Sequence, residues 1–190
     1  MQFKELLEKQ RKFSAETESH SERVSDYSGI IAMKIGFSAK KTEIIKKAAL
    51  LHDVGKLAVP SEILHKKGAL NQSEYDIVKS HITKGAKFIE QLDENEKDVI
   101  DMAKNIALEH HEKWNGTGYL GFKGEDISLE ARIVAVADVF DAISSKRCYK
   151  DCWDINDAKD VIIKGRGTHF DPVVVDIFVS CFEEIKKINR

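Results

Sequence analysis

Histidine and carboxylate side chains occur together at several points of the chain, and this combination is suited to binding divalent metal ions. The strongest example is the adjacent pair His52 and Asp53, which follows apolar positions between residues 44 and 51 that are typical of a buried helix. Gly55 comes soon after and would allow a sharp backbone exit where that helix ends. Because a buried pair without partners is costly, we expect it to bind a metal ion or to be hydrogen-bonded at a helix end.

Other histidines lie in similar positions. Glu16 precedes His20 by one helical turn, so both side chains project from one face and can reach a common ion; a solvated acid-base pair is the alternative. Imidazole and carboxylate without a well-placed thiolate suit iron, manganese, zinc or nickel. These ligands outnumber the needs of one ion, which predicts two or three metals sharing a bridging carboxylate, an arrangement that hydrolyses phosphoesters. The histidines on or at the end of predicted apolar-faced helices are His20, His52, His81, His110 and His111.

Length and charge favour one domain without a nucleic-acid partner. The chain has 190 residues, of which 42% are hydrophobic, and its net charge of -2 arises from 30 basic and 32 acidic residues that are well mixed. We therefore expect no DNA, RNA or membrane partner. The three cysteines (Cys148, Cys152 and Cys181) form no CxxC pair, which favours a reducing compartment. Because no apolar run reaches the length of a membrane span and the N-terminus lacks a signal-peptide core, we predict a cytoplasmic location.

Helical spacing of apolar residues, together with only two prolines, predicts an almost entirely α-helical protein. Residues 1–13 are predicted to form a separate N-terminal helix, a linker or signalling stub, and residues 14–190 the main domain. Gly36 should close a long helix that begins near residue 15. The remaining helices are predicted over residues 42–52, 72–89 (opened by a capping box at 71–74), 99–111, 129–145 (carrying Asp138) and from Asp171-Pro172 onward.

Several segments, taken in order, resemble one family. They are HDVGK at residues 52–56, His81, HHEKWNGTGY at residues 110–119, ADVFDA at residues 137–142, Arg147 and GTHFDP at residues 167–172. Together they resemble the HD-GYP family of the HD phosphohydrolase superfamily, and the match extends from about Glu16 to the last helix. A His-Asp dipeptide alone is a weak signal, whereas this many spaced segments is a specific one. The resemblance implies an all-α HD-domain helical bundle with a buried multi-metal site.

The resemblance also implies which residues bind metal. Two or three divalent ions are expected, with iron first and manganese as the alternative, and Asp53 is the implied bridge. Position by position, the matching ligands are His20, His52, Asp53 and Asp138 (shared with the wider superfamily), His81, His110 and His111 (a second metal) and Glu16 (members with three metals).

The implied activity is hydrolysis of cyclic di-GMP to pGpG, with GMP as a further product left open, through attack of a metal-bound hydroxide on the phosphodiester. Asp53 and Lys56 are the implied catalytic residues, and Lys56 matches a lysine that contacts the scissile phosphate. Arg147 and Lys150 match cations that grip the dinucleotide. Tyr119 is expected either to stack a guanine or to pin its loop to the core. A homodimer is also left open.

Two departures from the family pattern concern the loops. Leu120 stands where the family has the proline of Gly-Tyr-Pro, and Cys148 stands where a proline commonly follows the arginine. We expect the loss of proline to loosen the loop without emptying the metal site. Since that loop is linked in the family to docking of GGDEF domains, and a sensor or receiver domain is usually fused to this one, such partners are implied as well. The alternatives are a non-catalytic cyclic di-GMP sensor or GGDEF-docking module, and an HD phosphohydrolase acting on another nucleotide.

Overall fold

The computed structural model describes residues 1–13, 15–145 and 153–188, with the side chains of residues 15–18 and 94 also outside the description. Within these ranges the chain is built from helices, and a single β-bridge joins Arg166 and Phe170. The α-helices are α1 (Phe3–Phe13), α2 (Ala15–Ile35), α3 (Ala39–Ala49), α4 (Ser61–Leu64), α5 (Gln72–Lys79), α6 (His81–Ile89), α7 (Lys97–Glu109), α8 (Leu129–Ser144), α9 (Ile155–Lys164), α10 (Pro172–Ser180) and α11 (Phe182–Ile188). Short 3-10 turns are η1 (Val54–Ala58), η2 (Glu94–Glu96) and η3 (Gly124–Asp126). The predicted all-α fold is confirmed.

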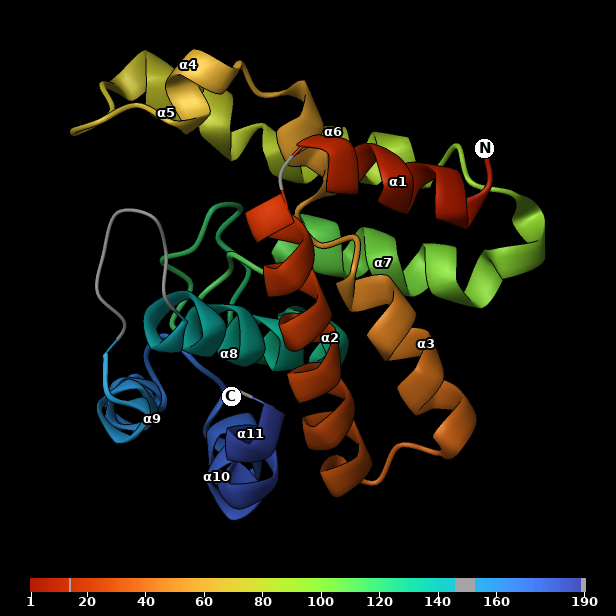
Figure 1. Cartoon of the computed structure of the whole chain (residues 1–190). Helices are drawn as coiled ribbons and strands as arrows, with labels where there is room; N and C mark the ends of the chain where they lie inside the picture. The colour runs from red at the N-terminus through yellow and green to blue at the C-terminus, as the bar shows by residue number, and fades with distance from the viewer. Residues whose placement is uncertain (14, 146–152, 189–190) are drawn as a thin grey trace.

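The bundle is organised around α2, which packs against α3 on one side and α8 on the other. Helix α7 bridges α3 and α8, and α6 packs on both α7 and η1. Figure 1 shows α2 running through the middle of the molecule, with α10 and α11 beside its C-terminal end and α4 and α5 projecting at the opposite end. The N-terminal halves of α2 and α6, the turn after α3 and the end of α7 therefore meet in one region.

Apolar side chains from these helices fill one continuous core. Tyr27 and Ile31 of α2 are fully buried, as are Phe140 of α8 and Phe178 of α10. Tyr27 and Phe178 both meet the Phe140 ring edge-on, with centroids 5.5 and 5.2 Å away. Such ring pairs add stability beyond that expected from the area that they bury, so they hold α2, α8 and α10 together.

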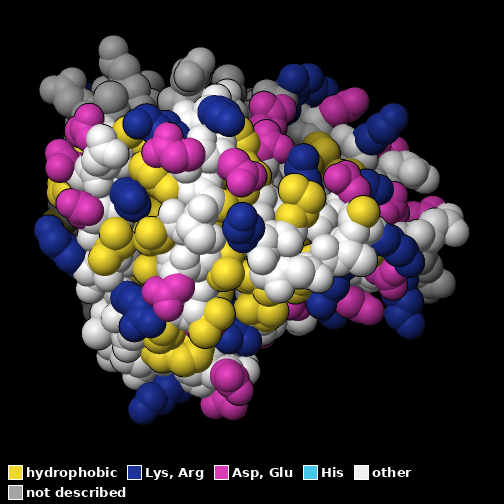
Figure 2. All heavy atoms as spheres, turned by 90° about the horizontal axis from the view of Figure 1, so that it is seen from below, with side chains coloured by type: hydrophobic (Ala, Val, Ile, Leu, Met, Phe, Trp, Pro, Cys, Tyr) yellow, Lys and Arg dark blue, Asp and Glu magenta, His cyan; other side chains and the backbone are white. Residues whose placement is uncertain are grey.

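The described residues on the face seen from below form no broad field of one charge (Figure 2). On the face seen from below, acidic and basic side chains alternate, with hydrophobic side chains scattered between them (Figure 2). This agrees with the small net charge of -2. In the described part of the chain, no helix has both the length and the apolar character that crossing a lipid bilayer requires.

Local signals place several helix ends where the sequence predicts them. Helix α2 ends at Ile35 before Gly36, whose φ of 107° is a backbone conformation that glycine adopts most readily. Asn71 and Glu74 form the expected capping box at the start of α5. Asp171 caps α10, and Pro172 occupies its first turn.

Four predicted helices have clearly different bounds. The helix expected over residues 42–52 is α3, which starts at Ala39 because Ser38 caps it and stops at Ala49, so His52 lies in the following turn. The helix expected over 72–89 breaks at Ser80 into α5 and α6, and α7 ends before His110. The segment after Asp171 likewise splits into α10 and α11, and α9 is an additional helix. These breaks place several histidines at helix ends, where their side chains can converge.

Candidate metal centre

Three histidine rings point one nitrogen inward because the other is held by the backbone. His52, His81 and His110 each place Nδ1 against a carbonyl oxygen of the preceding turn, which fixes Nδ1 as the protonated donor. Nε2 is then the free acceptor, and in each ring it is buried without a hydrogen-bond partner among the described residues. Such an outer hydrogen bond is the usual way to orient a metal-binding imidazole. The three acceptors are Ala49 O (2.8 Å), Val78 O (2.6 Å) and Ile106 O (2.9 Å), respectively.

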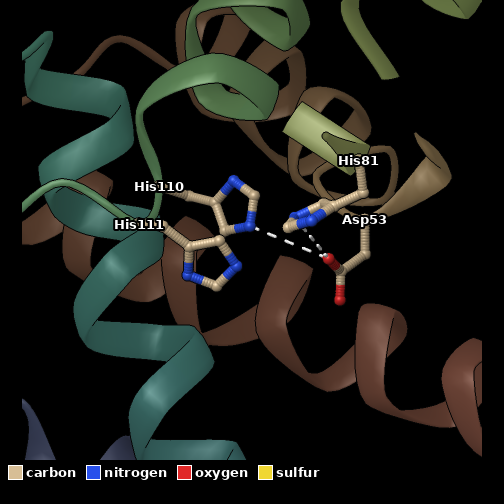
Figure 3. Close-up of side chains that lie close together, drawn as sticks. All are labelled: Asp53, His81, His110 and His111. Carbon is tan, nitrogen blue, oxygen red and sulfur yellow. Dashed lines mark ion pairs between the residues drawn. The ribbon is translucent and has the colours of Figure 1, made fainter. Parts of the chain in front are cut away.

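Asp53 lies between these inward-facing nitrogens. Its Oδ1 is 3.5 Å from His81 Nε2 and 3.7 Å from His110 Nε2, and no hydrogen bond to this buried oxygen forms within the described residues. Figure 3 shows the two rings directed at the carboxylate, with His111 beside them. Its other oxygen, Oδ2, is 3.4 Å from His52 Nε2. Ligand atoms about 2 Å from a shared cation lie about 3 to 3.5 Å from one another, so this spacing fits a metal ion better than direct hydrogen bonds.

The potential ligands fall into two groups that share one residue. In each group the ligand atoms all lie within 4.8 Å of one another. Asp53 belongs to both, because its two oxygens face different histidines. The donor set therefore fits two ions bridged by a single carboxylate. The two groups are Asp53, His81, His110 and His111, and His20, His52 and Asp53.

His20 is enclosed by carboxylates on both sides of its ring. Nε2 is 3.1 Å from Asp138 Oδ1, and Nδ1 is 2.7 Å from Asp141 Oδ2. Burial alone would lower the pKa of His20, but the two carboxylates outweigh it and raise this pKa to about 9. Asp141 is itself held by Arg23 through hydrogen bonds of 2.6 and 3.0 Å. Asp141 thus orients the outer side of the ring, while Nε2 and Asp138 face the centre.

Burial keeps the imidazoles of His81 and His111 in the neutral form that can bind metal. Burial lowers the pKa of His81 to about 4 and that of His111 to about 2, so both rings are neutral at pH 7 and have a lone pair to donate. Burial alone would raise the pKa of the Asp53 carboxyl group. The nearby Lys56 and His52 outweigh burial and hold this pKa well below its usual range. The Asp53 carboxyl group is therefore anionic over the whole physiological pH range, which is the form that can bind a metal ion.

Gly55 brings the Asp53 turn against α6, where His81 lies. A Cβ atom at this position would be 1.8 Å from the His81 carbonyl oxygen and 2.6 Å from the Gly85 nitrogen, so only glycine fits. The sequence analysis explained this glycine by a sharp backbone exit at a helix end, and that explanation needs correction. The φ of Gly55 is not positive, and the residue lies within the 3-10 turn η1. The requirement is close approach of two backbones, and this approach places Asp53 within reach of His81.

Glu112 is an important residue that the sequence analysis did not identify. Its side chain is buried, with the residue only 2% exposed, and it accepts three hydrogen bonds from the glycine-rich loop formed by residues 114–124. Leu120 N donates to Oε1 at 2.6 Å, while Gly121 N and Phe122 N donate to Oε2 at 2.9 and 2.8 Å. Gly118 is needed for this packing because a Cβ there would lie 2.5 Å from Glu112 Cα. The feature of the sequence that could have indicated this role is an acidic residue just before a glycine-rich loop, whose backbone N–H groups can donate hydrogen bonds to it.

This clamp changes the expectation for Leu120. A proline at this position has no N–H and could not donate to Glu112. The loosening expected from the missing proline is therefore offset by a hydrogen bond that leucine adds. Three further backbone bonds hold the start of the loop, from Trp114 N to His169 O, from Asn115 N to Thr168 O and from Gly116 N to Lys113 O.

Of the predicted substrate contacts, the structure places two next to the centre. Lys56 pairs with Asp53 Oδ2 and is partly exposed. The Tyr119 ring lies over His111, with centroids 4.8 Å apart, and within 6.5 Å of His81. Arg147 and Lys150 lie outside the described residues, as does the side chain of Glu16, whose backbone is one turn before His20 in α2.

The helical architecture and the paired His/Asp groups define a protein of the HD type, in which a helical bundle carries a buried metal centre. The HD domain family model matches residues 3–174. Relatives named as cyclic di-GMP or 3'3'-cGAMP phosphodiesterases match most of this chain. It therefore belongs to the HD domain family and, within it, to the HD-GYP family.

Among these relatives, 3'3'-cGAMP-specific phosphodiesterase 2 of Vibrio cholerae is 40% identical over 177 residues, covering 93% of this chain and 33% of that protein. The cyclic di-GMP phosphodiesterase response regulator RpfG of Xanthomonas campestris is 41% identical over 173 residues, covering 90% and 45%. A cyclic di-GMP phosphodiesterase of Thermotoga maritima is 39% identical over 176 residues, covering 92% and 47%. The chain thus spans a third to about half of the length of these relatives.

Solved structures confirm the fold at lower sequence identity. Bd1817, an HDG"Y"P protein from Bdellovibrio bacteriovorus, superposes with a TM-score of 0.66 at 24% identity, covering 88% of this chain and 52% of that one. The HD domain of the Listeria monocytogenes phosphodiesterase PgpH, in complex with cyclic-di-AMP, gives a TM-score of 0.59 at 21% identity, covering 95% and 96%.

Proposed function

We propose that this chain is a metal-dependent phosphodiesterase that hydrolyses cyclic di-GMP to pGpG, with GMP as the product of a second hydrolysis. The observation that carries the proposal is the convergence of four buried side-chain atoms that have no hydrogen-bond partner among the described residues: Oδ1 of Asp53 and Nε2 of His52, His81 and His110. Buried polar atoms left unpaired cost free energy, and a pair of divalent cations would satisfy all four.

We assign the ligands as two overlapping sets. Asp53 would bridge the ions, with His20, His52 and Asp138 completing one site and His81, His110 and His111 the other. Ions bound there would activate water and neutralise charge on the phosphate oxygens. Iron is our first choice and manganese the alternative, since imidazole and carboxylate suit both. Glu16 would supply a ligand for a third ion, and a Glu16→Ala variant would then bind less metal while keeping part of its activity.

Residues of the chain would position the substrate around these ions. Lys56 lies beside Asp53 with part of its side chain exposed, so its ammonium can offset negative charge that develops on the phosphate oxygens. The Tyr119 ring lies over His111, so it would be close to a phosphate bound at these ions. We assign Arg147 and Lys150 as further phosphate contacts on the resemblance alone.

The second candidate substrate is 3'3'-cGAMP. Among the relatives, three Vibrio cholerae proteins are named as specific for this dinucleotide, including one that matches 93% of the chain at 40% identity. Both substrates present the same phosphodiester linkage to the metal centre and differ in one base. The chemistry proposed for the site is therefore the same, and the choice between them depends on base contacts.

The experiment is a chromatographic turnover assay on protein purified without oxygen and loaded with ferrous iron or manganese. Cyclic di-GMP, 3'3'-cGAMP and cyclic di-AMP are supplied separately, and the Asp53→Ala variant is assayed in parallel. We expect pGpG from cyclic di-GMP with the parent protein and no product with the variant. Intact substrates with a metal-loaded parent would instead support a nucleotide sensor or a GGDEF-docking module. Faster turnover of 3'3'-cGAMP would assign that substrate.

A further inference from the structure

Tyr75 of α5 is a large aromatic residue that the structure leaves open to solvent beside the metal centre. The residue is 41% exposed, and α5 buries no residue of its own. Its ring meets the Tyr119 ring edge-on, with centroids 6.0 Å apart and an interplanar angle of 78°. Tyr75 is thus held in place at one edge while part of its ring stays accessible.

A continuous row of rings leads from Tyr75 to the metal centre. Tyr119 follows Tyr75, and the Tyr119 ring is tilted by 43° against His111 at 4.8 Å. His111 in turn lies 4.0 Å from His110, centroid to centroid. Tyr75 therefore stands one ring beyond Tyr119 in the row that ends at the metal centre.

A cation accompanies the two tyrosines. Lys79 lies one helical turn after Tyr75 on the same face of α5, and its Nζ is 5.4 Å from the centre of the Tyr119 ring. An ammonium group on an aromatic surface is a common feature of sites for nucleotides, in which rings stack on bases and cations attract phosphates. Because Tyr75, Tyr119 and Lys79 lie next to a centre suited to phosphodiesters, the ligand class that they fit is a nucleotide.

We propose that Tyr75 and Tyr119 form a nucleobase-binding shelf, on which Tyr75 stacks against a base of the dinucleotide whose phosphate is at the metal centre. This inference rests on the proposed function. The competing explanation is structural, in which Tyr75 only pins α5 to the glycine-rich loop. Stacking on a base requires the ring but not the hydroxyl group, whereas a contact made by the hydroxyl group would require the hydroxyl.

The test is steady-state kinetics of the metal-loaded parent protein, Tyr75→Ala and Tyr75→Phe with cyclic di-GMP. Removal of one base-stacking ring should raise KM about ten-fold in Tyr75→Ala with little change in kcat, and Tyr75→Phe should keep the parent KM. Met33→Ala serves as the matched control, because Met33 is 57% exposed near the far end of α2. Since stacking tolerates every base, 3'3'-cGAMP should show a KM increase of similar size wherever it is a substrate.

The outcomes separate this inference from the proposed function. Turnover by the parent with an unchanged KM in Tyr75→Ala would overturn the shelf and leave the phosphodiesterase assignment intact. A rise in KM in Tyr75→Phe as large as in Tyr75→Ala, or a loss confined to kcat, would show that Tyr75 acts through its hydroxyl or through the loop, and would also overturn the shelf. No turnover by the parent would refute the proposed function and with it the shelf as part of a substrate site.

Discussion

The hydrogen bonds that Glu112 accepts from the glycine-rich loop lead to a quantitative prediction for stability. A bond to an ionised group contributes about 1.5 to 3 kcal/mol, and the low end applies here because the three donors belong to residues at the surface, where water can replace part of the loss. Replacement of Glu112 by alanine removes three such bonds and the burial of the side chain. Three bonds at about 1.5 kcal/mol each predict that the free energy of unfolding falls by about 4 to 5 kcal/mol.

Two further variants divide this effect. In Glu112→Gln, the amide oxygen can still face Gly121 N and Phe122 N, while the NH2 group meets Leu120 N–H, so we expect an intermediate loss of about 2 kcal/mol. Glu109→Ala, at the last residue of α7 and close to Glu112 in the chain, is the matched control, because that glutamate accepts one hydrogen bond from the backbone, from Ser128 N at 2.7 Å. Its loss should be about 1 kcal/mol.

The assay is urea unfolding followed by circular dichroism, with all proteins stripped of metal by a chelator so that differences in metal binding do not contribute. Midpoints should fall in the order parent, Glu109→Ala, Glu112→Gln and Glu112→Ala, with unchanged slopes. A Glu112→Ala protein within about 0.5 kcal/mol of the parent, or equal to Glu109→Ala, would refute the argument that Glu112 holds the loop.

Two other predictions concern the turn that carries Asp53. Gly55→Ala should lower the free energy of unfolding by about 2 to 3 kcal/mol and should also lower the amount of bound metal, because a Cβ 1.8 Å from the His81 carbonyl oxygen forces the turn away from α6. Urea denaturation and metal analysis of the variant measure these two effects. Parent values for both would contradict the argument that the two backbones must approach closely. Lys56→Ala should reduce kcat about 100-fold with metal retained, and an unaffected rate would show that Lys56 does not act on the phosphate.

The elements that the sequence predicts well are those specified by local signals. The capping box of Asn71 and Glu74 and the positive φ of Gly36 depend on residues within one turn, so they appear in the sequence as they do in the structure. The break at Ser80 has no such signal, because no glycine or proline stands there and the apolar pattern continues through it. Ser80 Oγ instead bonds Ile77 O at 2.5 Å where the chain bends into α6.

The candidate site shows the same division. Histidine and aspartate are restricted enough in chemistry that their types and order predict a metal centre, and the structure brings His52, Asp53, His81 and His110 together. Glu112 could not be found in that way, since a glutamate beside two histidines is equally suited to bind metal or to accept hydrogen bonds. Only the fold of the loop back onto its carboxylate distinguishes the two roles.

The measurement that tests the central claim most directly is the number of metal ions bound per chain. Protein loaded with ferrous iron under nitrogen and freed of excess metal is analysed by mass spectrometry, as the parent and as Asp53→Ala. Because Asp53 faces both groups of histidines, we expect at least two ions per parent chain and loss of ions from both groups in the variant, to less than about one per chain. A parent that binds no metal, or a variant that binds as many ions as the parent, would contradict a centre bridged by Asp53.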